Sequence, residues 1–275
     1  MFPKFVRGLK KTFQQRQRVR DEIKSWKQFQ LWYSSLLGKQ FAKSEKLILE
    51  QYLPDLFGYY LLQCGCPEIM SENKAGTWLS SSRVSSKFCL DYAYGEGIHC
   101  QSNLAHLPMK SDSLDIVILP HVLDFSDEPH QVLREAERVL IAEGHVVILG
   151  FNPWSLWNIA RLVLFWTKQA PWNARFLNPY RVVDWLALLG FDVVQKQGYF
   201  YSPPLQNSSI LSKFHFLEKL GQKLWPFFGA GYVLVARKRV QTLTPIRQGW
   251  SNRKRKNRRQ VLARNALKPI NRNKM

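Results

Sequence analysis

Acidic residues are almost absent from the two ends of this chain of 275 residues. Residues 237–275 contain fourteen Lys and Arg and no Asp or Glu, and residues 1–28 contain nine basic residues against two acidic ones. Subtracting these from the 40 basic and 20 acidic residues of the whole chain leaves 17 and 18 for residues 29–236. The net charge of +20 therefore belongs to the ends, and the nearly neutral middle need not be a nucleic-acid-binding surface.

Cysteine is also scarce, with four in the chain, and no set of Cys and His residues has the spacing of a zinc site. We therefore expect no metal. Cys64 and Cys66 would lie on one face of a strand, too far apart along it for an easy disulfide. Free thiols in a reduced cytosol are the expectation.

Long apolar runs are missing as well. The most apolar stretch, residues 154–166, is too short to span a bilayer and contains Arg161. Lys4, Arg7 and Lys10 interrupt the N-terminal residues, which excludes a signal peptide. We expect a cytoplasmic, monomeric protein with no transmembrane segment.

What the chain does contain, from residue 59 on, is an alternation of strand-like and helix-like patterns. Helices are predicted at 128–142, ended by Gly144, and at 180–189, ended by Gly190. Strands are predicted at 61–64, 88–91, 97–101, 114–119, 145–149, 191–195 and 232–236. The pattern predicts an α/β fold: a doubly wound, Rossmann-like, seven-stranded and mostly parallel sheet with helices on both faces.

Three parts are predicted along the chain: a basic helical N-terminal extension at 1–55, the α/β domain at 56–240, and a basic disordered tail at 241–275. In the extension, Trp26, Phe29, Trp32 and Tyr33 lie on one helical face. We favour packing of this face on the domain over a lid or a membrane-surface helix.

Residues 107–153, "LPMKSDSLDIVILPHVLDFSDEPHQVLREAERVLIAEGHVVILGFNP", resemble the second half of the class I S-adenosylmethionine-dependent methyltransferases, in the small-molecule-type group. The resemblance continues through residues 180–194 and covers about 59–238 in all, while 150–157 and 239–250 resemble a bacterial branch of that superfamily. It implies S-adenosylmethionine as cofactor and a methyltransferase activity, and the acceptor cannot be deduced.

The resemblance also implies a cofactor site at the carboxyl ends of the strands, where the strand order reverses. The family pattern V-L-D-x-G-C-G-x-G corresponds to residues 61–69, "LLQCGCPEI", so Gln63 replaces the acid and Pro67 replaces a glycine. Asn103 replaces a second acid, after the third strand. The cofactor-binding residues predicted in this way are Gln63, Gly65, Asp91, Asn103, Leu104 and Pro120.

His121 follows the fourth strand and is the candidate catalytic base, with packing under the cofactor as the alternative. Asp124 and Asn152 are candidate contacts to the acceptor. The Trp-rich segment 154–172 is predicted to pack in the core, with an acceptor lid or a membrane interface as alternatives.

Three functions remain open at this point. The first is an active methyltransferase of unknown acceptor, and the second is a catalytically degenerate binding or scaffold protein with the same fold. The third is an RNA-associated protein that uses its basic tails. We expect the basic ends to contact nucleic acid or anionic lipid without sequence specificity.

Overall fold

The structure is a computed structural model that describes residues 17, 19–69, 75–164, 170–204 and 228–239. The tail predicted at 241–275 lies outside the described residues. So do residues 1–16, the first part of the predicted N-terminal helical extension. Among the residues that are described, no helix combines the length and the apolarity needed to cross a membrane.

Seven strands form one sheet in the order β3-β2-β1-β4-β5-β7-β6. All neighbouring pairs are parallel except those of β7, which runs antiparallel to both β5 and β6. The predicted fold class is confirmed. The strands are β1 (Tyr60–Cys64), β2 (Ser86–Asp91), β3 (Cys100–Gln101), β4 (Leu114–Pro120), β5 (Leu140–Phe151), β6 (Phe191–Tyr199) and β7 (Gly231–Lys238).

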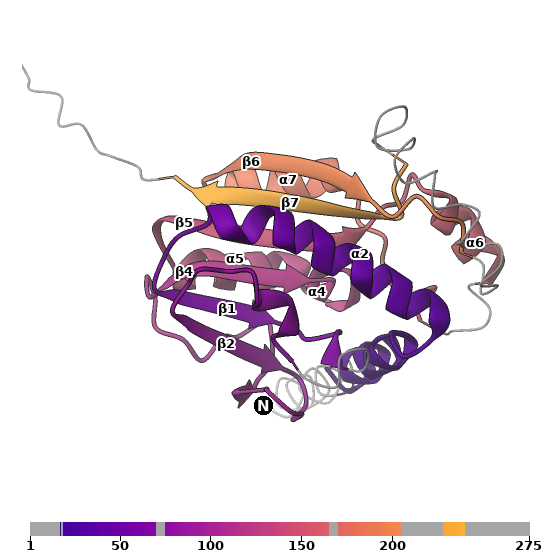
Figure 1. Cartoon of the computed structure of the whole chain (residues 1–275), viewed down its shortest axis with the longest axis horizontal. Coiled ribbons are helices and arrows are strands. Elements are labelled where there is room, and N and C mark those ends of the chain that lie inside the picture. The colour runs from indigo at the N-terminus through magenta and orange to yellow at the C-terminus, as the bar shows by residue number, and fades with distance from the viewer. Residues whose placement is uncertain (1–16, 18, 70–74, 165–169, 205–227, 240–275) are drawn as a thin grey trace, which may run out of the picture. The chain divides into compact units, whose positions relative to one another are not determined.

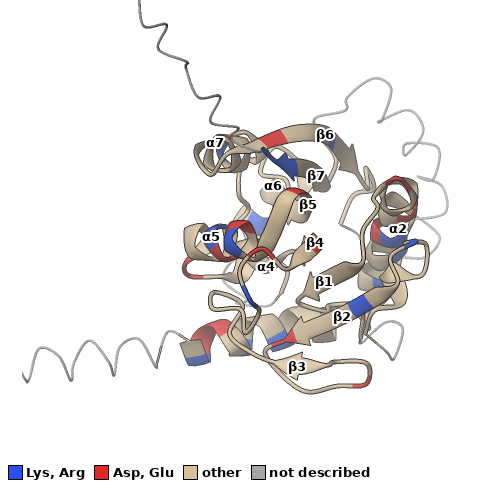
Figure 2. Cartoon of the chain, turned by 90° about the vertical axis from the view of Figure 1, so that its left-hand side faces the viewer, with Lys and Arg blue, Asp and Glu red and all other residues tan. Residues whose placement is uncertain are grey.

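Helices cover both faces of the sheet. In Figures 1 and 2, α2 crosses one face, and α5 and α7 lie on the other. The helices are residues 19–32, α2 (Leu36–Tyr52), α4 (Val122–Phe125), α5 (Pro129–Val139), α6 (Leu156–Leu164) and α7 (Pro179–Leu188), with short 3-10 turns η1 (Leu53–Asp55) and η2 (Thr77–Leu79). Figure 2 marks acidic and basic residues on both α2 and α5; among those of α2, Glu45 is fully buried.

The central strands are apolar because both of their faces are covered. β4 has one charged residue, Asp115, near its amino end. Its carboxylate oxygen Oδ2 accepts hydrogen bonds from the backbone N–H groups of Tyr59 (2.9 Å) and Tyr60 (2.8 Å). Asp115 therefore ties the start of β1 to β4, at the end of the sheet opposite the carboxyl ends of these parallel strands.

Several predicted boundaries are wrong; β6, for example, continues beyond the predicted 191–195 to Tyr199. α5 ends at Val139, and residues 140–142, predicted as helix, already belong to β5. Glu143 has φ +63°, and a Cβ at Gly144 would lie 2.9 Å from the Ile141 carbonyl oxygen, so this pair marks an irregularity of the strand rather than a helix end. The third strand has only two residues instead of the predicted 97–101. Gly190, in contrast, has φ +82° and ends α7 as predicted.

Residues 19–53 share the hydrophobic core of the α/β domain. Trp26, Phe29 and Tyr33 are buried, as the packing prediction for that face required. On α2, Phe41 stacks on Phe151 of β5 at a ring distance of 5.5 Å. The N-terminal helices therefore form one of the walls around the carboxyl edge of the sheet.

Candidate active site

The turn after β1 contains a glycine in the left-handed backbone region. Gly65 has φ +81°, where a side chain is strained, and its N–H donates to the carbonyl oxygen of Leu90 at 2.7 Å. A Cβ at this position would lie 2.8 Å from the indole ring of Trp26 and 3.0 Å from Val122. The space in front of the glycine is thus occupied by the indole of a residue in the first helix.

Asp91 at the end of β2 is buried, and both of its carboxylate oxygens accept two hydrogen bonds. Oδ1 accepts from the indole N–H of Trp26 (2.9 Å) and the backbone N–H of Tyr92 (2.6 Å). Oδ2 accepts from the side-chain amide of Gln30 (3.1 Å) and the backbone N–H of Cys66 (2.7 Å). Burial raises the pKa of Asp91, and these donors partly oppose the increase.

Gln63 and Glu68 form a buried pair in the turn. The Gln63 amide donates to Glu68 Oε1 at 2.8 Å and to the carbonyl oxygen of Gly65 at 3.2 Å, and Glu68 Oε1 also accepts from the N–H of Gly76. Burial raises the pKa of Glu68 to about 8. The family's acid is thus absent from position 63, but a carboxyl group five residues later occupies the same turn. The oxygen Oε1 of Gln63 is buried without a hydrogen-bond partner among the described residues.

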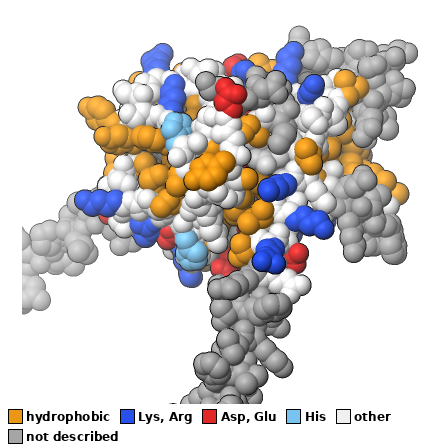
Figure 3. Space-filling model, turned by 90° about the horizontal axis from the view of Figure 1, so that it is seen from below, with side chains coloured by type: hydrophobic (Ala, Val, Ile, Leu, Met, Phe, Trp, Pro, Cys, Tyr) orange, Lys and Arg blue, Asp and Glu red, His pale blue; other side chains and the backbone are white. Residues whose placement is uncertain are grey.

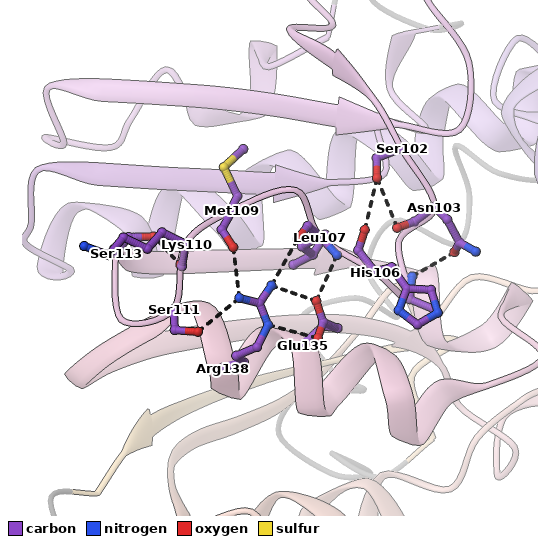
Figure 4. Close-up of polar contacts among 11 residues, drawn as sticks. Ser102, Asn103, His106, Leu107, Met109, Lys110, Ser111, Ser113, Glu135 and Arg138 are labelled. Carbon is purple, nitrogen blue, oxygen red and sulfur yellow. Dashed lines mark hydrogen bonds and ion pairs between the residues drawn. The ribbon is translucent and has the colours of Figure 1, made fainter.

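The loop after β3 is stabilised by its own polar side chains (Figure 4). Asn103 Oδ1 accepts from the N–H of Ala105 at 2.9 Å, a local turn, and Ser102 Oγ donates to the carbonyl oxygen of His106 at 3.1 Å. Leu104 is fully buried. The carbonyl of Asn103, expected to meet a ligand, therefore stabilises the loop in this structure.

Glu135 and Arg138 of α5 hold the rest of this loop in place (Figure 4). Glu135 Oε2 accepts from the N–H of Leu107 at 2.9 Å, and Arg138 donates to the carbonyl oxygens of Leu107 (3.0 Å) and Met109 (2.9 Å). The two side chains also pair with each other at 2.8 Å. Hydrogen bonding from Arg138 lowers the pKa of Glu135. The segment that precedes β4 is therefore fixed by one helix.

His121 follows Pro120 at the end of β4, and both of its ring nitrogens contact carboxylates. Nε2 lies 2.6 Å from Glu45 Oε1, on α2, and Nδ1 lies 2.9 Å from Asp124 Oδ2. Glu45 also accepts from the hydroxyl groups of Tyr33 (2.5 Å) and Tyr199 (2.9 Å). We call Glu45, His121, Asp124, Tyr33 and Tyr199 the buried histidine cluster.

The environment of this cluster holds His121 as a cation. The imidazole is fully buried among Phe29, Phe41 and Phe151, whose rings lie 4.2 to 5.7 Å away. Burial lowers its pKa, but Glu45 and Asp124 outweigh burial and raise the pKa to about 9. An imidazolium with both nitrogens on carboxylates has no lone pair with which to accept a proton, so the arrangement favours packing beneath the site. Catalysis by His121 stays a prediction that would require Glu45 or Asp124 to move.

Asp124 and Asn152, the two residues predicted to contact the methyl acceptor, form hydrogen bonds within the protein. Asp124 is buried, accepts from the N–H of Phe151 at 2.9 Å, and has its pKa raised by burial. Asn152 donates from its amide to the carbonyl oxygen of Gly229 at 2.9 Å and accepts from the N–H of Trp154 at 3.0 Å. Their contact with an acceptor remains untested.

Sequence reasoning missed Glu45, Trp26 and Gln30 as parts of the site. Glu45 lies four residues after Phe41 and three before Ile48, on the buried side of α2. A carboxylate at a core-facing helical position is a signal that was available, because a buried charge requires a partner. No sequence signal paired Trp26 or Gln30 with Asp91, which is more than 60 residues away.

Comparison with known proteins agrees with the geometry. The model of the family described as "Methyltransferase domain" matches residues 80–148. In the sheet, β1 and β2 are parallel neighbours, so the Gly65 turn after β1 and Asp91 at the end of β2 lie at one edge. The chain therefore carries a methyltransferase-domain match and has the fold of the class I S-adenosylmethionine-dependent methyltransferases. The match begins downstream of the Gly65 turn, the region in which residues 63–69 depart from the family pattern.

One curated protein is related to the chain in sequence, and two solved structures share its fold. The chain is 33% identical over 225 residues to "Uncharacterized protein YafS" of Escherichia coli K12, covering 79% of this chain and 85% of that protein. A Thermotoga maritima structure, described as an S-adenosylmethionine-dependent methyltransferase and possible histamine N-methyltransferase, superposes with a TM-score of 0.50 at 17% identity, covering 78% of this chain and all of that one. A putative methyltransferase in complex with the Haloferax volcanii activator Trm112 gives 0.51 at 13% identity, with 77% and 98% covered. At 17% and 13% identity, these two structures show only that this chain has the same fold as they do.

Proposed function

We propose that the protein is an S-adenosylmethionine-dependent methyltransferase. The observation that carries this function is the position of Gly65 and Asp91 at the carboxyl ends of neighbouring strands β1 and β2. The neighbour of β1 on its other side is β4, so the strand order reverses at β1, where open α/β sheets bind ligands. A glycine admits close approach of a ligand there, and a carboxylate is a natural acceptor for ribose hydroxyl groups.

Three features fit S-adenosylmethionine. Gly65 has no side chain, so a ligand can approach the backbone of this turn once Trp26 moves away. Gln63 has an unpartnered buried oxygen suited to an ammonium or hydroxyl donor, and Asp91 offers a carboxylate. The proposed cofactor supplies an electrophilic methyl group when bound. This chain would hold the ribose through Asp91 and the adenine near Leu104, and hydrophobic walls would exclude water.

The first helix competes for the same carboxylate. Trp26 lies against Gly65, and the side chains of Trp26 and Gln30 each donate to Asp91. Ribose hydroxyls can replace these donors only if residues 19–32 release Asp91. We therefore propose that cofactor binding and displacement of this helix are coupled, and that the helix covers the site in the absence of ligand. The helix lies beyond the carboxyl ends of β1 and β2 (Figure 1).

Asp91→Ala is expected to weaken binding of S-adenosylhomocysteine by roughly 1.5–3 kcal/mol, the range for hydrogen bonds to a charged group. Calorimetric titration of the purified protein measures this. Because Asp91 also accepts from two backbone N–H groups, the melting temperature of the variant must be recorded and the titration run below it. Asp184→Ala, an exposed carboxylate on α7, is the control and should leave the affinity unchanged.

Gln30→Met is expected to tighten binding several-fold, since it removes one competing donor from Asp91 while keeping a side chain of similar length. The Gln30 amide also donates to the carbonyl oxygen of Cys66 at 3.2 Å, so the ligand-free protein should lose about 1–2 kcal/mol of stability with these two hydrogen bonds. Gln101→Met is the matched control, because its amide donates to the carbonyl of Tyr92 and does not reach Asp91. Weaker binding by Gln30→Met would mean that the helix belongs to the occupied pocket and does not compete.

A folded parent protein that shows no binding at millimolar S-adenosylhomocysteine would overturn the enzyme proposal. The saturated hydrogen bonding of Asp91 would then favour the second candidate, a catalytically degenerate methyltransferase-fold binding protein. Binding that survives Asp91→Ala unchanged would instead place the ligand elsewhere in the fold.

A further inference from the structure

The helix α6 turns a hydrophobic face to solvent. Leu156, Ile159 and Val163 are spaced three and four residues apart, so they lie on one side of the helix, and they are 56%, 61% and 69% exposed. Leu162 flanks them and is 63% exposed. A contiguous group of large apolar side chains on one element is unusual for the free surface of a monomer and marks an interaction site.

The charged residue of α6, Arg161, does not lie on this apolar face. Arg161 is turned toward the body of the protein, where its Nε donates to the carbonyl oxygen of Trp172 and its guanidinium lies 5.1 Å from the centre of the Phe176 ring. Trp157 anchors the inner side, buried and hydrogen-bonded to the carbonyl oxygen of Ser202 at 3.0 Å. The helix is therefore held by its inner side and presents only apolar groups outward. This corrects the expectation that the Trp-rich segment packs in the core: Trp157 does, but Trp154 is exposed.

The position of α6 relates this face to the candidate active site. The helix begins five residues after the end of β5, so it lies beyond the carboxyl ends of the parallel strands, at the edge that carries Gly65 and Asp91 (Figure 1). A surface that contacts α6 would therefore lie on the same side of the molecule as the cofactor turn.

The charge of the chain indicates which surface that is. Residues 1–28 and 237–275 carry a net charge of +7 and +14, and the residues between them are nearly neutral. On the face seen in Figure 3, Lys and Arg side chains also lie between hydrophobic ones. A helix with an apolar face, combined with basic segments, is the composition of proteins that bind anionic lipid at the membrane surface. A nucleic acid would use the basic ends but would leave the apolar face of α6 unexplained.

We propose that α6 is a membrane-docking element. Leu156, Ile159 and Val163, together with Trp154, insert into the interfacial region of an anionic lipid layer, and the basic ends of the chain supply the long-range attraction. The docking is peripheral and does not depend on cofactor binding. A nine-residue helix reaches only the interfacial region and does not cross the bilayer.

Co-sedimentation of the full chain with vesicles tests the proposal. We expect binding to vesicles of equal parts phosphatidylglycerol and phosphatidylcholine, little binding to phosphatidylcholine alone, and weaker binding as salt increases. The double substitution Ile159→Asp with Val163→Asp should reduce binding about tenfold or more, since two carboxylates would have to enter the interface. Its melting temperature should stay unchanged, because both side chains are exposed.

Leu188→Asp on α7 and Leu47→Asp on α2 are matched controls, since both leucines are exposed and neither lies on α6. They should bind vesicles like the parent. Equal vesicle binding by the parent and the α6 variant would overturn the proposal. If the variant then also had a lower melting temperature, the chain itself would cover α6. If it instead converted a dimer to a monomer in sedimentation velocity, the face would belong to contact with a second copy.

Discussion

Glu45→Ala is expected to destabilise the protein by about 3–5 kcal/mol, the usual result of removing one partner from a buried ion pair. Glu45 lies 2.6 Å from His121 and accepts hydrogen bonds from Tyr33 and Tyr199. Without it, the imidazolium keeps only Asp124, and two buried hydroxyl groups lose their acceptor. Urea unfolding of parent and variant measures the difference. Glu50→Ala, the same change at a half-buried position of the same helix, should cost far less.

The pH dependence of the parent provides a second measurement of the same cluster. The pKa of His121 is raised to about 9 from 6.5, so the folded state binds the proton more tightly than the unfolded state. Its contribution is complete below pH 6.5 and is lost as the pH rises through 9, at about 3 kcal/mol in total. Because Glu45 is the main cause of the increase, Glu45→Ala should flatten this alkaline loss of stability. An unchanged slope in the variant would show that His121 is not the cation proposed here.

Gly65→Val is expected to abolish cofactor binding and to lower the stability of the ligand-free protein as well. The valine would adopt φ +81°, and its Cβ would meet the indole of Trp26 at 2.8 Å. If the space in front of Gly65 were open, the substitution would affect ligand binding more than the stability of the ligand-free protein. Since Trp26 fills that space, a stability loss beyond the backbone strain of about 1–2 kcal/mol is expected.

Gly190→Val is the matched control for this experiment. Gly190 has φ +82°, and a Cβ there would meet nothing within 4 Å, so it tests backbone strain without a steric clash. Both variants should lose stability in urea, Gly65→Val more, and only Gly65→Val should lose the thermal shift caused by S-adenosylhomocysteine. A parent-like shift in Gly65→Val would show that the ligand does not use this turn.

The α/β fold could be predicted because its signals are local. β4 is apolar from Ile116 to its end, and α7 combines helical periodicity with a terminal glycine. The boundary of α5 was missed for a physical reason. Leu140 and Ile141 continue the helical apolar pattern, but Leu140 pairs with Leu114 of β4, and the hydrogen bonds of a neighbouring strand prevailed over local preference.

The candidate site was predictable to a lesser extent. Gly65 and Asp91 follow strands in the sequence, so the edge on which they meet follows from a parallel sheet. The partners that decide their chemistry come from far along the chain: Trp26 and Gln30 reach Asp91, and Glu45 reaches His121, from helices whose periodicity indicates only a buried face. The side chains that a buried helix face contacts therefore cannot be deduced from its periodicity.

By itself, therefore, the sequence determined the class of fold, the order of its elements, the edge of the sheet that carries the site, and the concentration of positive charge in the ends. These properties depend on short-range pattern and on composition. Only the tertiary structure decided that His121 is an enclosed cation, that the first helix covers the cofactor turn, and that α6 leaves its apolar face exposed. Each of these depends on which distant side chains fill the remaining space, and close packing settles that only when all elements are in place.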